Sequence, residues 1–547
     1  MEIVNSVDKR RNRLYLAVVF ISAVIFFIPN LGKVHLFDWD EINFAESARE
    51  MLVTHNFHRV MINFQPFWEK PPLFFWLQSV SMQLFGVNEF SARLPNAIFG
   101  IITLLTLYFI GKKEFNAQFG FFWALSYLGT ILPYVYFKSG IIDPVFNYFI
   151  FTGVYCMYLS LRESTTRRQL WYIALSGILI GLSNLTKGPV GLLMFLITFL
   201  AWFSFTRFKN FPGLRNIVVF ILCFGVVTFF WFGREVMNNG FWFLKEFLSY
   251  QVELFRTPVA GHEEPIYYHF LVVFLGCFPI SVLAIPVMFR KSVGAENRLL
   301  LVMKILFWTV MILFTIVTTK IVHYSSLSYL PLSFIASIYL QRLLQGLRPS
   351  RSVLFILGLT GMVFSFLMTA LPLVAEHPAW LISKLKDPVA VAALQLPVHW
   401  NGYEFMIGIC YFIGIIISLF IIAWQRIITG FILLFYSTAV SLFFYLVAVV
   451  PKIEAYSQGP VIEFYKSIAG KDVYVTPVAF KSYAHYYYFQ KPGPTRFNEE
   501  DSLMKGNIDK PAYFVVKINN EKFDTACKDC RLLYVKGGYK FYQRDVK

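Results

Sequence analysis

Long apolar segments dominate this chain and limit the architectures that it can adopt. About thirteen runs are roughly 17–25 residues long and carry almost no charge. They cover residues 14–31, 92–111, 117–134, 145–161, 170–186, 188–205, 216–232, 267–289, 299–317, 322–340, 353–373, 403–424 and 427–449. A backbone inside a bilayer must satisfy its own hydrogen bonds, so these runs predict membrane-spanning α-helices. Only 15% of residues are charged, against roughly 25% in soluble domains, so we expect a polytopic all-α membrane protein.

The basic residues of the chain indicate its orientation in the membrane. The net charge of +17 is divided among short segments between alternate apolar runs, at 9–13, 112–113, 162–168, 207–215, 290–291, 341–351 and 426. The positive-inside rule predicts that these segments are cytoplasmic. The long connections 32–91, 233–266 and 374–402 then lie on the exterior side. Nucleic-acid binding is not expected, because the basic residues form no single stripe.

The apolar runs stop near residue 450. We therefore predict a membrane module over 1–450 and a small exterior α/β domain over 451–547. A helix is expected over 460–470, and short β-rich runs occur at 472–476, 485–489, 512–518 and 532–543. Gly537 and Gly538 separate two alternating runs, which is typical of a β-hairpin.

Cys527 and Cys530 form a CKDC pair in this predicted exterior domain. The spacing is compatible with a short-loop disulfide, half of a metal site or two free thiols. An oxidising compartment favours the disulfide.

Charge is concentrated in the segment that follows the first apolar run. Asp40 and Glu41 are adjacent, in DWDEINFAESAREML (38–52), and charge beside a membrane often marks a functional site. A capping box from Asp38 to Glu41 is the alternative, and it leaves Asp40 unexplained. From Glu41 onward the apolar residues follow helical spacing, which predicts an amphipathic helix lying in the membrane interface. A second helix is expected over 71–86.

Further charged or polar candidates fall on the same predicted face. They are Lys70 in FWEKPPL, Asp143 in KSGIIDPVF, Lys187 in NLTKGPVGL, His262 and Arg256 in the 233–266 loop, and Lys320, His323 and Tyr324 in TTKIVHYSSLSYLP. Each has an ordinary alternative: a snorkelling lysine, an Asp-Pro turn or a hydrogen-bonded core histidine. Their shared face is the stronger observation. Cations suit a phosphate, and a carboxylate suits an acceptor hydroxyl, so the pattern favours an enzyme acting on a phosphate-bearing lipid.

A transporter of lipid-linked sugars is the leading alternative. Transporters often place charge near the middle of the bilayer and contain internal repeats. The predicted spans contain few acids, and no repeat is evident. A non-catalytic relative whose exterior tail binds envelope partners is a further alternative.

The order of several motifs resembles that of the GT-C membrane glycosyltransferases. These motifs are DEINFAESAREM, FWEKPPL, GVNEFSARLPNA, Asp143, TKGP and KIVHYSSLSYLP, within about the first 340 residues. The pattern is most similar to the bacterial aminoarabinose transferases that act on lipid A, and to the protein O-mannosyltransferases. Asn43, Phe44 and the His323–Ser325 run depart from that pattern.

The resemblance implies a role for each matched residue. Asp40 and Asp143, with Glu41 beside the first, are the expected catalytic acids. Lys70 and Tyr324, together with Arg256, Lys187 and Lys320, are expected to hold the carrier phosphate. Glu69 and His262 match a pair that binds a divalent metal such as zinc; no nucleotide cofactor is implied.

The resemblance also implies a reaction and a location. We expect a glycosyltransferase that moves a monosaccharide from a polyprenyl-phosphate carrier to a cell-envelope acceptor such as lipid A, another glycolipid or glycan, or a protein. The protein would be a multi-pass component of the bacterial inner membrane, with its active site and C-terminal domain in the periplasm.

Overall fold

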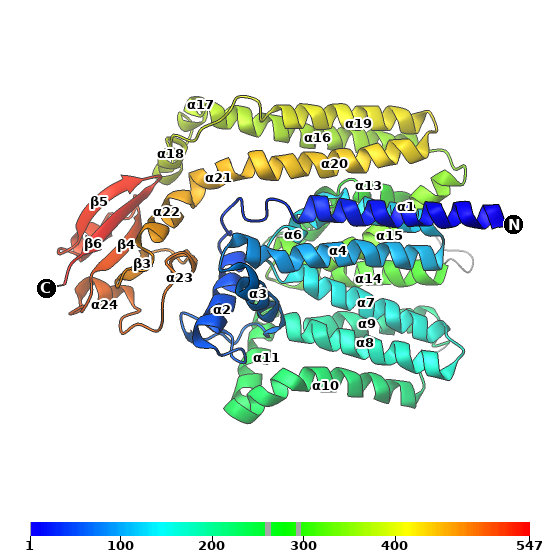
Figure 1. Ribbon diagram of the computed structural model, residues 1–547, viewed down its shortest axis with the longest axis horizontal. Helices are drawn as coiled ribbons and strands as arrows, with labels where there is room; N and C mark the ends of the chain where they lie inside the picture. Colours follow the sequence, from blue (N-terminus) through cyan, green and yellow to red (C-terminus); the bar gives the residue numbers. More distant parts are fainter. Residues whose placement is uncertain (1, 210, 258–263, 291–296, 547) are drawn as a thin grey trace.

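The structure is a computed structural model that describes residues 2–209, 211–257, 264–290 and 297–546. Long, roughly parallel helices form most of the molecule, and a small sheet lies beyond one end of them (Figure 1). The N-terminus lies at the opposite end. The three long connections predicted to be exterior contribute α2, α3, α11, α17 and α18, which lie at the sheet end.

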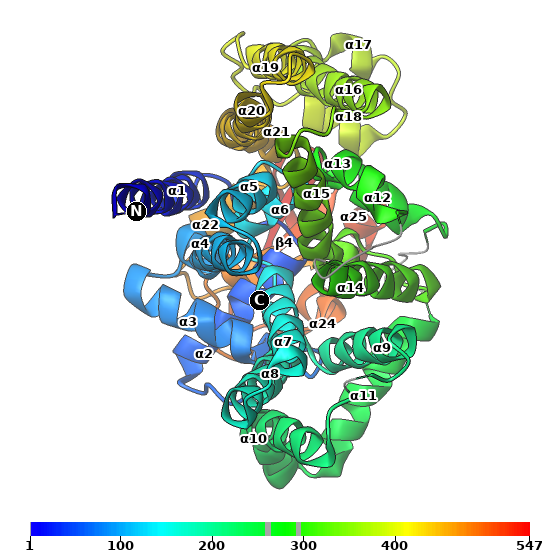
Figure 2. The same cartoon turned by 90° about the vertical axis from the view of Figure 1, so that its right-hand side faces the viewer.

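The long helices occupy the predicted apolar runs, whereas α11, α17 and α18 lie in the predicted exterior connections. Their bounds are α1 Glu2–Phe27, α4 Glu89–Glu114, α5 Ala117–Leu128, α6 Ile131–Phe137, α7 Asp143–Arg162, α8 Thr166–Lys187, α9 Val190–Phe205, α10 Leu214–Asn239, α11 Phe241–Arg256, α12 Tyr268–Gly276, α13 Ile280–Met288, α14 Asn297–Ile316, the 3₁₀ helix η2 Val322–Ser328, α15 Tyr329–Leu344, α16 Arg351–Glu376, α17 Ala379–Ile382, α18 Pro388–Leu394, α19 Met406–Ala423 and α20 Ile427–Ala448. Viewed along the helices, α16, α19 and α20 lie at one side of the bundle and α8 and α10 at the other (Figure 2).

The predicted count of thirteen spans is not confirmed. Among the described residues, nine helices are long and apolar enough to cross a membrane, or up to eleven if each of two bent helix pairs is one span. The predicted runs 14–31 and 188–205 account for the difference. The first lies in α1, whose N-terminal half carries Lys9 and three arginines, and the second forms α9, which has only 16 residues.

The first connection folds into short elements at one end of the long helices. It contains α2 Asp40–Thr54, a two-residue hairpin of β1 Met61–Ile62 and β2 Gln65–Pro66, and α3 Leu73–Phe85. The helix expected over 71–86 is confirmed as α3. The expectation that the polar side of α2 faces water is wrong, because Glu46, Arg49 and Glu50 on that side are buried as fully as its apolar residues. The place of α2 in the membrane interface stays a prediction. The capping box is also wrong: α2 begins at Asp40, and no side chain caps it.

The C-terminal region joins further helices to a four-stranded sheet. The helices are α21 Val450–Ser457, α22 Gly459–Ile468, α23 Ala484–Tyr487, α24 Glu500–Lys505 and α25 Lys522–Ala526, and the strands are β3 Tyr474–Val478, β4 Ala512–Lys517, β5 Arg531–Lys536 and β6 Tyr539–Arg544. The strand order is β3-β4-β6-β5, with β3 parallel to β4 and the other pairs antiparallel. The hairpin is confirmed, and both Gly537 and Gly538 adopt positive φ. The run 485–489 is wrong as a strand prediction, because it begins within α23. Cys527 and Cys530 form a disulfide.

A shared apolar core attaches this C-terminal region to α2. Ile42, Ala45 and Ala48 of α2 pack in one cluster with side chains from α22, α23 and the sheet. Burial of such side chains removes apolar area from water and stabilises the contact by roughly 25 cal/mol per Å². Arg49 adds a polar link by donating to the backbone oxygen of Lys491 at 2.9 Å. The helix that begins at Asp40 is therefore held between the helical bundle and the C-terminal region.

Candidate functional site

Asp40 and Asp143 are brought together from two separate helix N-termini. Asp40 begins α2 and Asp143 begins α7, where Pro144 suits the first helical turn. His323, in η2, lies between them. Its Nε2 is 3.5 Å from Asp40 Oδ2 and 3.9 Å from Asp143 Oδ2. The Asp40 side chain is 40% exposed and that of Asp143 only 6%, so Asp40 is the carboxylate that remains accessible.

Lys187 neutralises the buried carboxylate. It is the last residue of α8, and its Nζ lies 2.6 Å from Asp143 Oδ1. The same ammonium group is 5.0 Å from the centre of the Tyr324 ring, a distance suited to a cation–π contact. Tyr324 therefore faces the Asp143–Lys187 pair, as its predicted phosphate role requires.

A cavity of about 50 Å³ opens beside these groups. Its polar lining comes from Lys70, Asp143, Asn147, Lys187, Gln251 and Tyr324. Its remaining walls are apolar side chains of α7, α9 and α14, with Val317. A polar end with two lysines on otherwise apolar walls suits an amphiphile whose head group is an anion.

Lys70 enters this cavity from the loop before α3. Burial lowers the pKa of its ammonium group, and the charge of Lys187 acts in the same direction. The carboxylates of Glu69, Asp40 and Asp143 oppose that shift. The ammonium lies 5.6 Å from the centre of the Tyr250 ring, and the Tyr250 hydroxyl donates to Glu69 Oε2 at 2.8 Å. Helix α11 thereby holds the Glu69-Lys70 segment in place.

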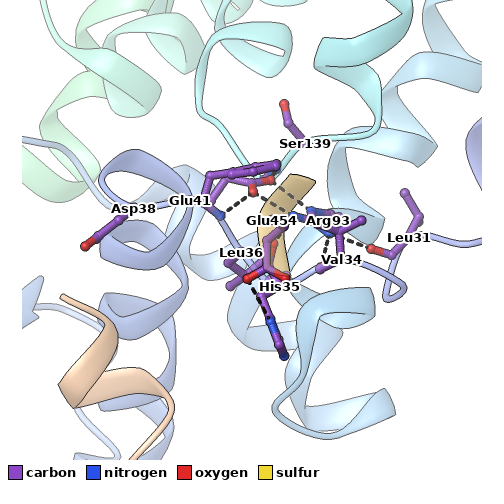
Figure 3. Close-up of polar contacts among 12 residues, drawn as sticks. Leu31, Val34, His35, Leu36, Asp38, Glu41, Arg93, Ser139 and Glu454 are labelled. Carbon is purple, nitrogen blue, oxygen red and sulfur yellow. Dashed lines mark hydrogen bonds and ion pairs between the residues drawn. The ribbon is translucent and has the colours of Figure 1, made fainter. Parts of the chain in front are cut away.

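Glu41 lies apart from the cavity, in a closed ion pair with Arg93 (Figure 3). Burial alone would raise the pKa of the Glu41 carboxyl, but Arg93 and two backbone N–H groups hold it below its ordinary value. Those N–H groups belong to Phe37 and to Gly140, three residues before Asp143. Glu41 is a positioning residue in this geometry, because it ties the start of α2 to the turn that leads into α7.

Two of the predicted phosphate ligands do not line the cavity. Arg256 is exposed at the end of α11. Lys320 is buried before η2 but is not among the described residues that line the cavity. Lys70, Lys187 and Tyr324 are the predicted ligands that the structure brings together.

Of the predicted metal pair, Glu69 and His262, the structure describes only Glu69. His262 lies outside the described residues, and Glu69 already accepts the Tyr250 hydrogen bond. No group of three or more His, Cys, Asp or Glu side chains able to hold a metal occurs among the described residues. The metal therefore stays a prediction.

Several residues of the site carried little signal in the sequence. His323 was a candidate only by its position, and Tyr250 and Asn147 resemble ordinary helix residues. Asn147 donates to Ser326 Oγ at 2.7 Å and so joins α7 to η2. The sequence did contain one sign that Arg93 has a partner. It lies at the start of an apolar run, where an unpaired charge is costly.

The chain is similar in sequence and in fold to known proteins. Residues 69–231 match the family described as dolichyl-phosphate-mannose-protein mannosyltransferase. An uncharacterised protein of Aquifex aeolicus is 29% identical over 328 residues, which is 60% of this chain and 73% of that protein. The undecaprenyl phosphate-alpha-4-amino-4-deoxy-L-arabinose arabinosyl transferase of Wigglesworthia glossinidia brevipalpis is 23% identical over 51% of this chain. That match spans 50% of the transferase.

The similarity extends over nearly the whole fold. The crystal structure of ArnT from Cupriavidus metallidurans has a TM-score of 0.76 in the apo state and 0.73 bound to undecaprenyl phosphate. Both alignments cover 96% of this chain and 97% of that one, at 16% identity. The chain is therefore a multi-pass membrane protein with the fold of ArnT. In sequence, parts of it are similar to the dolichyl-phosphate-mannose-protein mannosyltransferase family and to the aminoarabinose transferases.

Proposed function

We propose that this protein transfers a monosaccharide from a polyprenyl-phosphate carrier to an acceptor in the cell envelope. The observation that carries the proposal is the cavity in which Lys70, Lys187 and Tyr324 surround one polar end, with Asp40 and Asp143 beside it. The apolar walls suit a polyprenyl chain, and the two lysines suit its phosphate. The undecaprenyl phosphate complex of ArnT and the names of the curated relatives support this donor class.

The reaction follows from the chemistry of these groups. An acceptor oxygen attacks the anomeric carbon and forms the new glycosidic bond, while the bond from that carbon to the phosphate oxygen breaks. The polyprenyl phosphate leaves with the bonding electron pair. Lys70, Lys187 and Tyr324 stabilise the charge that develops on it.

Asp40 is the proposed catalytic residue. As the more exposed of the two carboxylates, it takes the proton of an acceptor hydroxyl; for an acceptor phosphate it instead orients the nucleophile. Asp143, paired with Lys187, keeps that lysine beside the phosphate position. We place the protein in a bacterial inner membrane with this end periplasmic, on the basis of the positive-inside pattern. Lipid A is the first acceptor to test, because the named relatives are aminoarabinose transferases.

The test is a transfer assay on the purified full-length chain in proteoliposomes. Undecaprenyl-phosphate-linked aminoarabinose and mannose are each supplied with lipid A or with an envelope-protein peptide, and the products are read by mass spectrometry. A product heavier by one sugar residue supports the proposal. Movement of the donor between leaflets with no new glycosidic bond would instead support a transporter and overturn it.

The matched pair of variants is Asp40→Asn and Asp501→Asn. Asp501 is an exposed carboxylate of α24 in the C-terminal region, 77% accessible. We expect Asp40→Asn to lower turnover by about 10²–10⁴-fold with unchanged expression and thermal stability. Asp501→Asn should behave as wild type. Near-normal turnover by Asp40→Asn contradicts its catalytic assignment.

A further inference from the structure

A second cavity lies in the C-terminal region and is unused by the transfer mechanism. Its volume is about 270 Å³, against about 50 Å³ for the cavity beside Asp143. Ligand pockets commonly measure about 300–1,000 Å³, so its volume suits a small ligand. One wall is residues 471–476, which lead into and include the start of edge strand β3. The other is drawn from residues 485–498, from α23 onward.

The charges in this cavity favour an anion. Lys471, Lys491 and Lys510 line it, against the single carboxylate of Asp472. Lys510 is paired with Asp472 at 2.5 Å. Lys491 is buried, and its ammonium donates to Asn63 and, at 3.0 Å, to Asn498, both of which are neutral amides. No carboxylate of the described residues lies within ion-pair distance of the Lys491 ammonium. Two of the three cations thus remain available to a ligand.

One ring nitrogen of a buried histidine also lacks a hydrogen-bond partner there, within the described part of the chain. His485 is 5% exposed and lines the cavity, and its Nδ1 makes no hydrogen bond to any described residue. Burial lowers the pKa of its imidazole to about 3, so the ring is neutral at physiological pH. A buried nitrogen without a partner costs free energy, which a ligand hydroxyl can recover.

The remaining lining suits a sugar ring. Tyr474, Tyr486, Phe489 and Phe497 supply aromatic surface, and Thr495 and Asn498 supply hydroxyl and amide groups. Aromatic faces pack against the C–H faces of pyranose rings, while hydroxyls and amides bond their oxygens. We propose that this cavity binds an anionic saccharide, such as a phosphorylated hexose unit, at a site separate from the transfer cavity.

The cavity is connected to the transfer site through α23, which contacts α2. In Figure 1, α23 lies between β3 and α2. The backbone N–H of Tyr483, just before α23, donates to Asp38 Oδ1 at 3.2 Å, and Lys481 lies 4.9 Å from the Trp39 ring centre. One short segment thus contacts both the cavity and the residues preceding Asp40. A saccharide held here would belong to an acceptor glycolipid, which rests on the proposed function, or to a free phosphosugar.

The test is binding of glucose 1-phosphate, glucose and inorganic phosphate to the full-length chain in nanodiscs, by isothermal titration calorimetry. All measurements use the Lys70→Ala background, so that the transfer cavity contributes little to anion binding. We expect glucose 1-phosphate to bind at least about tenfold more tightly than either glucose or phosphate alone. Equal binding of phosphate and glucose 1-phosphate would overturn the saccharide assignment.

Matched variants locate the binding. Lys471→Gln changes an exposed residue and should weaken glucose 1-phosphate binding by about three- to tenfold; adding Lys491→Gln should extend the loss to about 10–100-fold. Lys536→Gln, on strand β5 at the other edge of the sheet, is the control and should bind normally. Unchanged affinity in folded Lys471→Gln would overturn the site, whatever happens to Lys491→Gln.

A final arm distinguishes the two sources of the saccharide and separates this inference from the proposed function. In the Asp40→Asn variant, glucose 1-phosphate binding should persist whether or not transfer occurs.

The source of the saccharide is tested by comparing phosphatidylethanolamine nanodiscs with and without lipid A. Weaker glucose 1-phosphate binding in the presence of lipid A identifies the acceptor as the source, and unchanged binding identifies a free phosphosugar. Complete loss of binding in Asp40→Asn contradicts a separate site.

Discussion

The guanidinium of Arg93 donates to both carboxylate oxygens of Glu41, with Nε–Oε1 at 2.9 Å and Nη2–Oε2 at 2.7 Å. The same guanidinium donates to the backbone oxygens of Leu31, Val34 and His35 (Figure 3). Helix α4 therefore fixes the segment that leads into Asp40. Because Glu41 also accepts the N–H of Gly140, the pair sets the position of Asp40 relative to Asp143.

Breaking this pair should destabilise the protein strongly. Arg93→Met leaves the Glu41 carboxylate buried without its counter-ion, and such changes cost about 3–5 kcal/mol. The expected result is a markedly lower melting temperature in detergent, with transfer activity lost alongside. Glu41→Gln combined with Arg93→Met removes both charges and should recover part of the loss. Arg167→Met, at an exposed position in α8, is the control. A wild-type melting temperature for Arg93→Met contradicts this account.

Lys70 should act mainly on the donor. Lys70→Ala removes a charge-assisted contact to the carrier phosphate, which is worth about 1.5–3 kcal/mol, or roughly 10–100-fold in affinity. Titration of undecaprenyl phosphate into the purified protein measures this loss directly. Lys245→Ala, at an exposed position of α11, should bind normally. Unchanged donor affinity in Lys70→Ala would remove Lys70 from the phosphate site.

His323 should affect turnover more than donor binding, because it contacts the two carboxylates and does not line the cavity. His323→Phe removes both ring nitrogens and should lower kcat by about 10–100-fold, with little change in donor KM. His323→Gln retains an N–H donor and should recover part of that loss. His377→Phe, at the exposed end of α16, is the control. A rise in donor KM without a change in kcat would place His323 among the donor ligands instead.

Glu50 should make stability depend on pH. Burial, reinforced by the neighbouring Glu46 carboxylate, raises the pKa of Glu50 to about 8 from its ordinary value of 4.5. The folded state then holds this proton more tightly than the unfolded state. The stabilising contribution is complete below pH 4.5 and is lost as the pH rises to about 8, by up to about 1.4 kcal/mol per pH unit. Measured from pH 5 to pH 8, the melting temperature of wild type should therefore fall relative to that of a variant without this carboxyl. The His485 imidazole, whose pKa is lowered, contributes equally to both proteins.

Glu50→Gln provides the comparison. Its amide does not ionise, so its melting temperature should fall less over the same range. Lys491, whose pKa burial lowers to about 8, stays protonated in both states below that pH and adds little within the window. Parallel pH profiles for wild type and Glu50→Gln would show that the Glu50 carboxyl is not responsible.

The sequence alone determined the parts of the fold that depend on local pattern. Apolar runs of bilayer length become helices because each satisfies its own backbone hydrogen bonds. Helix α3 and the Gly537-Gly538 hairpin were equally predictable, since prolines and glycines fix the backbone locally. The strand prediction from local pattern failed at 485–489. These residues are mostly aromatic and favour strands, but the first of them belong to helix α23, because tertiary packing overrides local propensity.

Only the tertiary structure decided which charges meet. Residue type and predicted membrane face made candidates of seven residues: Asp40, Asp143, Lys70, Lys187, Tyr324, Arg256 and Lys320. The local sequence did not distinguish the first five, which meet at the site, from the last two, which do not line the cavity. Lys187 reaches Asp143 across 44 residues, and Glu41 reaches Arg93 across 52. Such pairings depend on how helices pack against one another, since each buried charge must find a partner in space. Sequence therefore determined that charge gathers at one end of the helices, and packing determined that Asp40 stays accessible while Glu41 is buried with Arg93.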